Sequence, residues 1–229
     1  MESTTTKIYW AADSTVQTNK ITTYPQTGIG QVFSLYTREG VVVINHAKNG
    51  RSTKSFIDEG RLDVIDAQIG EGDFLFVQFG HNDEKSEDPA RYTEPFSTYM
   101  MNLRRYIDVA RKHNAFPVLI TPLERRCFVD SKHLGLGAHS DYVAAMKQTA
   151  EQNNVPLVDL YSMSRAALKK AGEQESRKWY MYFIPRIYDN YPEGKEDNTH
   201  LRYEGAVKYA GLIADGLREL GGIYKDLVL

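Results

Sequence analysis

Serine, histidine and aspartate stand at positions in this 229-residue chain where they could act together. Asp197 precedes His200 by three residues, and a carboxylate at that spacing in a turn can reach the imidazole Nδ1. The imidazole Nε2 is then free to take a proton, which the hydroxyl of Ser14 in Asp13-Ser14-Thr15 could supply. Together they indicate acyl transfer by a serine nucleophile. Taken singly, each block is more typical of a helix-capping turn.

Two other positions could stabilise the oxyanion that such a reaction forms. Gly50 has no side chain, so its N–H could face a developing negative charge, and the amide of Asn82 could donate to the same charge. A turn glycine and an Asx-turn are the ordinary alternatives. The catalytic interpretation depends on the order in which Ser14, Gly50, Asn82 and His200 occur along the chain.

The elements that must position these residues follow the pattern of an α/β fold. Short apolar runs alternate with helical periodicities, which is typical of a parallel sheet covered by helices. The predicted strands are residues 8–11, 41–45, 74–78, 117–121 and 156–160. Parallel connections bring the carboxyl ends of strands to one edge, so we expect the polar residues after the first four strands to meet there.

Helical periodicity is strongest between the third and fourth predicted strands. There apolar residues recur at spacings of three and four: Phe96, Tyr99, Met100, Leu103, Tyr106, Ile107 and Ala110. Weaker patterns predict helices after Gly30, Asp58 and Ser140, over about 162–171 and over about 203–220. Residues 172–199 show no clear period, and we expect them to form a loop that borders the site.

Composition excludes several classes of function. The 28 Lys and Arg residues against 30 Asp and Glu residues give a net charge of −2, which disfavours binding to nucleic acid. Residues 1–7 lack the layout of a signal peptide, and no apolar run reaches membrane-spanning length. The lone Cys127 fits a cytoplasmic chain, and the absence of zinc-ligand spacing indicates that no metal is bound. The length of the chain predicts a single domain over residues 1–229. A secreted protein whose signal peptide had been removed would look the same.

The ordered blocks resemble those of the SGNH (GDSL-like) hydrolases. The resemblance rests on Asp13-Ser14, on Gly50, on Gly80-His81-Asn82-Asp83 and on the stretch from Asp197 to His200. It implies a flavodoxin-like three-layer α/β/α sandwich with a five-stranded parallel sheet. It also implies that Ser14 is the nucleophile, His200 the base and Asp197 its partner, with an oxyanion hole from the Ser14 and Gly50 N–H groups and the Asn82 amide. No metal or organic cofactor is required. Ala12 stands where the family usually has glycine, which matters only if that position needs positive φ.

Within this class the chain is most similar to rhamnogalacturonan acetylesterases, which implies removal of acetyl groups from pectic polysaccharide or oligosaccharide. The similarity lies in 13–15, 49–52, 78–83, 121–126 and 197–201. Arg51, Arg125 and Arg126 could pair with galacturonate carboxylates, although internal ion pairs are an equal alternative. His81 beside Asn82 could contact a substrate hydroxyl, and Asp13 beside the nucleophile is placed in the same substrate-binding group.

Other functions stay open from the sequence. An esterase or lipase acting on another short acyl ester shares the same triad, but a lipase would be expected to carry an apolar lid. The predicted loop instead mixes aromatic with charged residues. A carbohydrate-binding relative that has lost activity would not need Ser14 and His200 together. The aromatic run 179–188 could stack on sugars, or could pack the loop against the core, which is the more frequent case.

Overall fold

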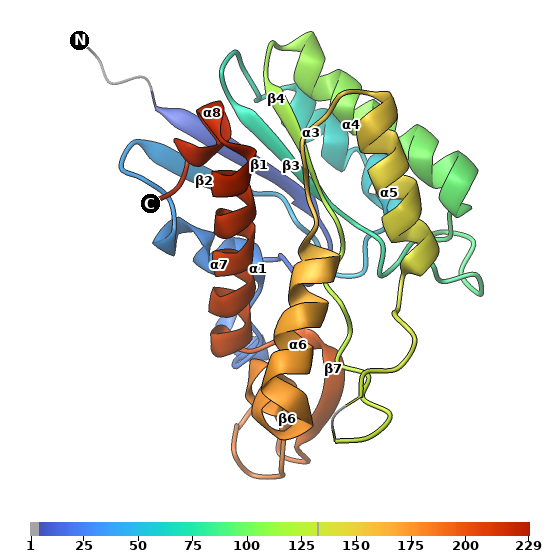
Figure 1. Cartoon of the computed structure of the whole chain (residues 1–229), viewed down its shortest axis with the longest axis vertical. Coiled ribbons are helices and arrows are strands. Elements are labelled where there is room, and N and C mark those ends of the chain that lie inside the picture. The colour runs from blue at the N-terminus through green and yellow to red at the C-terminus, as the bar shows by residue number, and fades with distance from the viewer. Residues whose placement is uncertain (1–4, 132) are drawn as a thin grey trace.

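A parallel sheet in the order β2-β1-β3-β4-β5 forms the centre of the computed structural model, which describes residues 5–131 and 133–229 (Figure 1). Each predicted strand matches or overlaps an observed one. The five strands are β1 (Thr6–Ala12), β2 (Val41–Asn45), β3 (Phe74–Gln78), β4 (Phe116–Ile120) and β5 (Leu157–Val158). Helices cover both faces of this sheet, so the expected three-layer α/β/α sandwich is confirmed. Residues 1–4 of the N-terminal stretch considered above lie outside the described residues.

The two faces of the sheet follow from the alternation of side chains along β1. Ile8 and Trp10 belong to one buried apolar cluster, and Tyr9 and Ala11 belong to the other. The first cluster includes α1 (Ile29–Val32), α6 (Leu160–Ser176) and α7 (Tyr203–Leu220). The second includes α2 (Thr53–Asp58), α3 (Arg61–Asp66), α4 (Met100–Lys112) and α5 (Ser140–Gln152). The strand β3, which is apolar from Phe74 to Val77, is therefore buried on both sides.

The predicted helices occur, with shifted ends. A π-helical turn, Pro95–Tyr99, comes before α4, and the predicted helix over 162–171 lengthens to α6 and is interrupted at Gly172, whose φ of 75° is not helical. The helix expected after Gly30 begins at Ile29 and lasts only four residues. Helix α2 was not predicted. Its signal was a capping box, in which the Ser52 and Ser55 side chains each accept from the other's backbone N–H.

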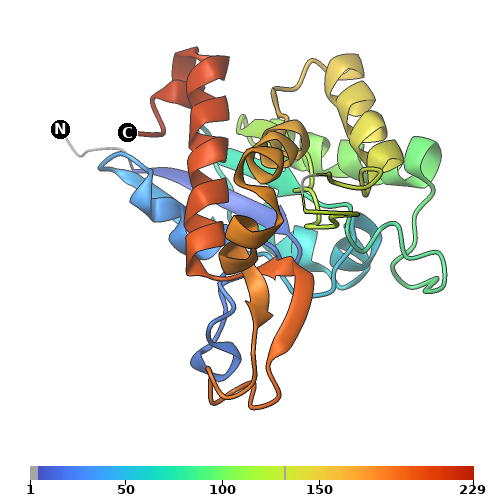
Figure 2. The same cartoon turned by 60° about the horizontal axis from the view of Figure 1, so that its bottom comes forward.

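The prediction of a structureless loop over 172–199 is wrong. This segment contains the end of α6, strand β6 (Tyr180–Phe183) and most of β7 (Lys195–Leu201), and the two strands pair antiparallel. Figure 2 shows this hairpin projecting beyond the sheet beside the segment that follows β1. The strand β7 is largely polar, so it has no apolar alternation from which it could be recognised; backbone pairing with β6 holds it in place.

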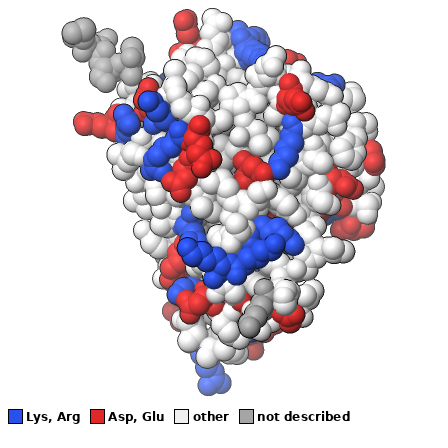
Figure 3. Space-filling view, in the orientation of Figure 1, with Lys and Arg blue, Asp and Glu red and all other residues white. Residues whose placement is uncertain are grey.

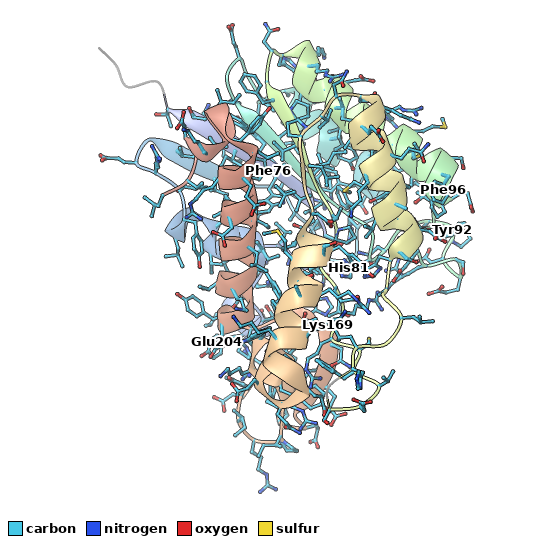
Figure 4. All side chains as sticks on the ribbon, in the orientation of Figure 1. Phe76, His81, Tyr92, Phe96, Lys169 and Glu204 are labelled. Carbon is cyan, nitrogen blue, oxygen red and sulfur yellow. The ribbon has the colours of Figure 1, made fainter. Side chains whose placement is uncertain are left out.

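Charge is unevenly spread over the surface. The space-filling view of Figure 3 shows a band of Lys and Arg across the face where Figure 4 places Lys169 on α6. Lys169 and its neighbour Lys170 are both exposed. Among the described residues no helix is both long enough and apolar enough to cross a membrane. The short helix α8 (Gly222–Lys225) closes the chain next to α7.

Candidate active site

Ser14 lies just beyond the carboxyl end of the central strand β1. The Asp13 carbonyl accepts hydrogen bonds from the Val16 and Gln17 N–H groups, and the Asp13 carboxylate accepts two more from Thr15. These bonds fold residues 13–17 into a tight turn that presents the serine side chain. Ala12 is the last residue of β1 and is not among the described residues with positive φ, so the position usually held by glycine carries alanine without strain.

The structure brings Ser14, His200 and Asp197 into one line, although His200 is 186 positions from Ser14 in the sequence. His200 Nε2 lies 2.9 Å from Ser14 Oγ, and its Nδ1 lies 2.8 Å from Asp197 Oδ2. Asp197 also accepts from the Thr199 and His200 backbone N–H groups. Burial alone would raise the pKa of the Asp197 carboxyl, but these hydrogen bonds and the nearby imidazole lower it to about 2. The carboxylate is thus ionised and ready to stabilise a charged imidazole.

Gly50 and Asn82 lie with Ser14 around the same pocket, whose volume is about 480 Å3. Gly50 has φ of 77°, a conformation that glycine adopts without strain. In the described part of the chain, neither the Ser14 N–H nor the Gly50 N–H donates to a protein acceptor. One hydrogen of Asn82 Nδ2 is directed at the Arg51 carbonyl, 3.1 Å away, and the other is left for a ligand. The arrangement suits a tetrahedral oxyanion.

Behind Ser14, Asp13 and His81 form a buried pair. Burial would raise the pKa of Asp13, yet His81 and the two hydrogen bonds from Thr15 lower it. Burial lowers the pKa of His81 to about 4, and its Nδ1 lies 3.4 Å from Asp13 Oδ2. The His81 ring also packs against His139 with the ring centroids 4.2 Å apart. His81 lines the pocket, whereas Asp13 is buried beneath it.

The three arginines expected to meet substrate are placed differently from one another. Arg125 lines the pocket and is held there by Glu84, 2.8 Å from its Nη2. The Arg51 side chain pairs with Glu59 and lies in a neighbouring hollow, so only its backbone carbonyl contacts the site. Arg126 does not line the pocket. It is buried, and its guanidinium donates hydrogen bonds to Ser176 Oγ, Asn198 Oδ1 and the Glu173 carbonyl.

Sequence reasoning missed two basic residues of the pocket, Lys85 and Arg91. Both lie on the long segment that follows Gly80-His81-Asn82-Asp83 and precedes the turn before α4. Their place on the segment after this motif is the sequence signal that could have identified them. With Arg125 they give the pocket three cationic side chains, and Arg91 Nη1 lies 3.3 Å from Asn82 Oδ1. No group of three or more His, Cys, Asp or Glu side chains in residues 5–131 and 133–229 is arranged to hold a metal ion.

Part of the aromatic run 179–188 packs against the core. Trp179 and Tyr180 are buried, and the Tyr180 hydroxyl donates to the Glu124 carbonyl and contacts the Tyr209 hydroxyl. These contacts fix β6, and through it β7 and His200. Tyr188 faces a separate hollow. Figure 4 shows His81 near the middle of the molecule and Glu204 at the lower end of α7, just beyond the strand that carries His200.

A three-layer sheet with serine, histidine and aspartate aligned at one edge is the arrangement of an SGNH hydrolase. Comparison with known proteins agrees: residues 13–206 match the model of the GDSL-like Lipase/Acylhydrolase family. The chain belongs to this family and is a carboxylic ester hydrolase.

Similar proteins extend over nearly the whole chain. It is 41% identical over 222 residues to the rhamnogalacturonan acetylesterase RhgT of Bacillus subtilis (strain 168), covering 96% of this chain and 93% of the relative. It is 45% identical over 214 residues to the probable rhamnogalacturonan acetylesterase YesY of the same strain, covering 93% of each. The crystal structure of Bacillus subtilis YxiM superposes with a TM-score of 0.79 at 25% identity; this comparison covers 95% of this chain and 57% of that protein.

Proposed function

We propose that this chain removes acetyl groups from an acidic, pectic glycan through a Ser-His-Asp acyl-enzyme mechanism. The observation that carries the mechanism is the continuous alignment of Ser14, His200 and Asp197, with distances of 2.9 and 2.8 Å at the two imidazole nitrogens. The similarity to proteins named rhamnogalacturonan acetylesterases supports the substrate class.

The first half of the reaction forms an acetyl-enzyme. His200 Nε2 takes the Ser14 hydroxyl proton as Oγ attacks the acetyl carbonyl, and the resulting oxyanion is held by the Ser14 and Gly50 N–H groups and by Asn82 Nδ2. The intermediate collapses, the bond to the sugar oxygen breaks, and His200 returns the proton to that oxygen. The sugar hydroxyl leaves and the acetyl group stays on Ser14.

The second half uses water. His200 removes a proton from a water molecule that attacks the acetyl carbonyl, the new oxyanion collapses, and the Ser14 oxygen leaves with the proton held by His200. Acetate is released and the enzyme returns to its starting state. Asp197 stabilises the imidazolium in both halves and keeps the same tautomer throughout.

The charge of the pocket supports an acidic glycan. Lys85, Arg91 and Arg125 surround the ester site, and a galacturonate carboxylate next to the acetylated sugar would meet a guanidinium capable of two parallel hydrogen bonds. A neutral acetylated glycan would offer these three side chains no negative charge.

The mechanism is tested with Ser14→Ala and His200→Ala on 4-nitrophenyl acetate. We expect Ser14→Ala to lose hydrolysis above background and His200→Ala to lose at least about a thousandfold in kcat. Arg104→Gln, an exposed change on α4, is the matched control. Undiminished turnover in Ser14→Ala would refute the proposed nucleophile.

The substrate class is tested separately by acetate release. We expect release from acetylated rhamnogalacturonan but little from acetylated xylan, which has no uronate backbone. Equal release from both would show that the enzyme is a general acetylesterase, which corresponds to the alternative of an esterase acting on other short-chain acyl esters.

A further inference from the structure

A second hollow lies at the end of β7, where the chain enters α7. Its volume is about 610 Å3, and its walls come from the loop after β1, from α1 and the turn after it, from the β6–β7 hairpin and from the first turn of α7. The residues that line it include Tyr24, Thr27, Tyr188, Arg202, Tyr203 and Glu204. None of them belongs to the acyl-transfer site described above.

Aromatic rings on its rim are open to solvent. Tyr24 is 55% exposed and Tyr203 is 56% exposed, and the Tyr24 and Tyr188 rings meet edge to face with centroids 5.6 Å apart. Tyr24 and Tyr188 also line a smaller adjoining hollow, so the surface continues past them. Amphipathic rings in a partly wet cleft are the usual surface on which the apolar face of a sugar packs.

Arg202 gives this hollow a free cation. Its guanidinium has one protein contact, from Nη1 to the Tyr188 hydroxyl at 3.4 Å, while its Nε is buried and has no acceptor among the described residues. No carboxylate of the described chain lies within ion-pair distance of it, whereas Arg125 and Arg126 both have such a partner. Glu204, the acidic residue of the hollow, is exposed at the rim. A ligand carboxylate would satisfy the unpaired Arg202 donors.

The walls are held in a fixed arrangement. Asn190 Nδ2 donates to the Ile21 and Tyr24 carbonyls, both at 2.9 Å, which ties the hairpin to the loop after β1. The Thr27 N–H donates to the Leu201 carbonyl at 2.9 Å, next to His200. Figure 2 shows these two segments side by side at the projecting end of the molecule. A preformed surface binds at a lower entropic cost than one that must be ordered.

The two sites are close enough for one glycan to reach both. Arg202 is two residues beyond His200, and an extended chain covers about 7 Å over that interval. We propose that this hollow is a second sugar subsite, which binds an acidic sugar of the glycan whose acetyl ester lies at Ser14. Arg202 pairs with the carboxylate, and Tyr24 and Tyr188 pack against the ring. The inference rests on the proposed function for its substrate and adds to it a specificity-determining site.

The kinetic experiment compares a long with a short ester. In Arg202→Gln, Tyr188→Ala and Tyr24→Ala, we expect kcat/KM on an acetylated rhamnogalacturonan oligosaccharide to fall by about tenfold, mostly through KM, which is the size of one lost charged hydrogen bond or ring contact. Hydrolysis of 4-nitrophenyl acetate, which is too small to reach the hollow, should stay at the wild-type rate. Arg104→Gln is again the control.

Wild-type kinetics on the oligosaccharide in all three variants would refute the proposed subsite and leave the proposed function intact. Arg202 is close to His200, so Arg202→Gln could also slow hydrolysis of 4-nitrophenyl acetate. In that case Tyr24→Ala is the deciding variant, because Tyr24 lies on a different segment from His200. A Tyr24→Ala variant that keeps wild-type KM on the oligosaccharide then refutes the inference.

A binding measurement separates this inference from the proposed substrate. Trigalacturonic acid has no ester, and we expect calorimetry to show that the wild type binds it and that Arg202→Gln binds it about tenfold more weakly. Maltotriose, which has no carboxylate, is the neutral probe, and we expect the wild type and Arg202→Gln to bind it with the same affinity. If the wild type fails to release acetate from the pectic oligosaccharide, the proposed substrate is wrong. Equal binding of trigalacturonic acid by wild type and Arg202→Gln overturns the subsite whatever the substrate.

Discussion

The Arg91 guanidinium lies 3.3 Å from the side-chain oxygen of Asn82, on the opposite end of the amide from the nitrogen that faces the Arg51 carbonyl. Both ends of the amide are therefore held, which fixes the second hydrogen of Nδ2 toward the pocket. Asp88 Oδ2, 2.6 Å from Arg91 Nε, holds the guanidinium in turn. We infer that Arg91 acts on the proposed oxyanion site through Asn82.

We expect Arg91→Met to lower kcat on 4-nitrophenyl acetate by roughly fivefold to tenfold with little change in KM, because it removes one charged hydrogen bond that orients Asn82. Arg91→Lys should recover part of the loss. Arg61→Met removes an ion pair to Glu59 away from the pocket and is the control. Unchanged kcat in Arg91→Met would show that Asn82 is held without it.

Asp197→Asn keeps the size of the side chain and removes its charge. We expect a loss in kcat of roughly a thousandfold or more, because an amide can hold the wrong imidazole tautomer and cannot stabilise the imidazolium. The pKa of Asp197 is about 2, so its charge is complete above pH 4 and its contribution to stability is lost only as the pH falls toward 2. Asp189→Asn on the exposed hairpin loop is the control, and an Asp197→Asn variant that keeps the wild-type kcat would contradict the assignment.

The strands and the order of the site blocks could be predicted because they rest on local signals. The strand Phe74–Gln78 is buried on both sides, so its first four residues are all apolar and the strand is visible in the sequence. Parallel topology then brings Ser14 and Asn82, which follow neighbouring strands, to one edge. These inferences needed no knowledge of a distant partner.

Features that depend on distant partners could not be predicted. The strand carrying Asp197 and His200 is polar, and its place is set by pairing with β6, whose Tyr180 is anchored to Glu124 and Tyr209. Arg126 and Arg125 are neighbours with the same chemistry, yet one is buried against Glu173 and the other lines the pocket. Packing decides the direction in which each of the two arginine side chains points, and the spacing of residues in the sequence does not indicate it.

Gly205, in the first turn of α7, packs against the backbone of Trp179. A Cβ there would lie 2.0 Å from the Trp179 carbonyl oxygen, which the neighbouring hydrogen bond from the Arg202 N–H holds in place. We expect Gly205→Ala to lower the free energy of unfolding by roughly 1–3 kcal/mol in urea, despite the better helix propensity of alanine. Gly211→Ala, whose Cβ would meet the end of the Tyr36 side chain at 3.0 Å, should cost less. A Gly205→Ala protein as stable as wild type would show that α7 and the turn before β6 can separate without cost.

Burial affects two neighbouring residues of the site in opposite ways. It lowers the pKa of His81 from 6.5 to about 4, and it raises the pKa of Asp83 from 3.8 to about 7 although Asp83 accepts hydrogen bonds from Thr53 and Thr93. Between pH 4 and 6.5 the unfolded chain binds more protons at His81, so this residue makes the free energy of unfolding rise with pH. Over nearly the same range the folded chain binds more protons at Asp83, so that residue makes it fall.

The two slopes oppose each other in the wild type, and single variants should expose them. In His81→Gln the rise is removed, so relative to wild type its stability should decline from pH 4 to 6.5 by up to about 3 kcal/mol, at 1.36 kcal/mol per pH unit. In Asp83→Asn the fall is removed, so relative to wild type its stability should increase over the same range. Urea unfolding at half-unit pH steps measures both differences. Curves that stay parallel to the wild type would mean that these groups titrate alike in the folded and unfolded chain, contrary to their burial.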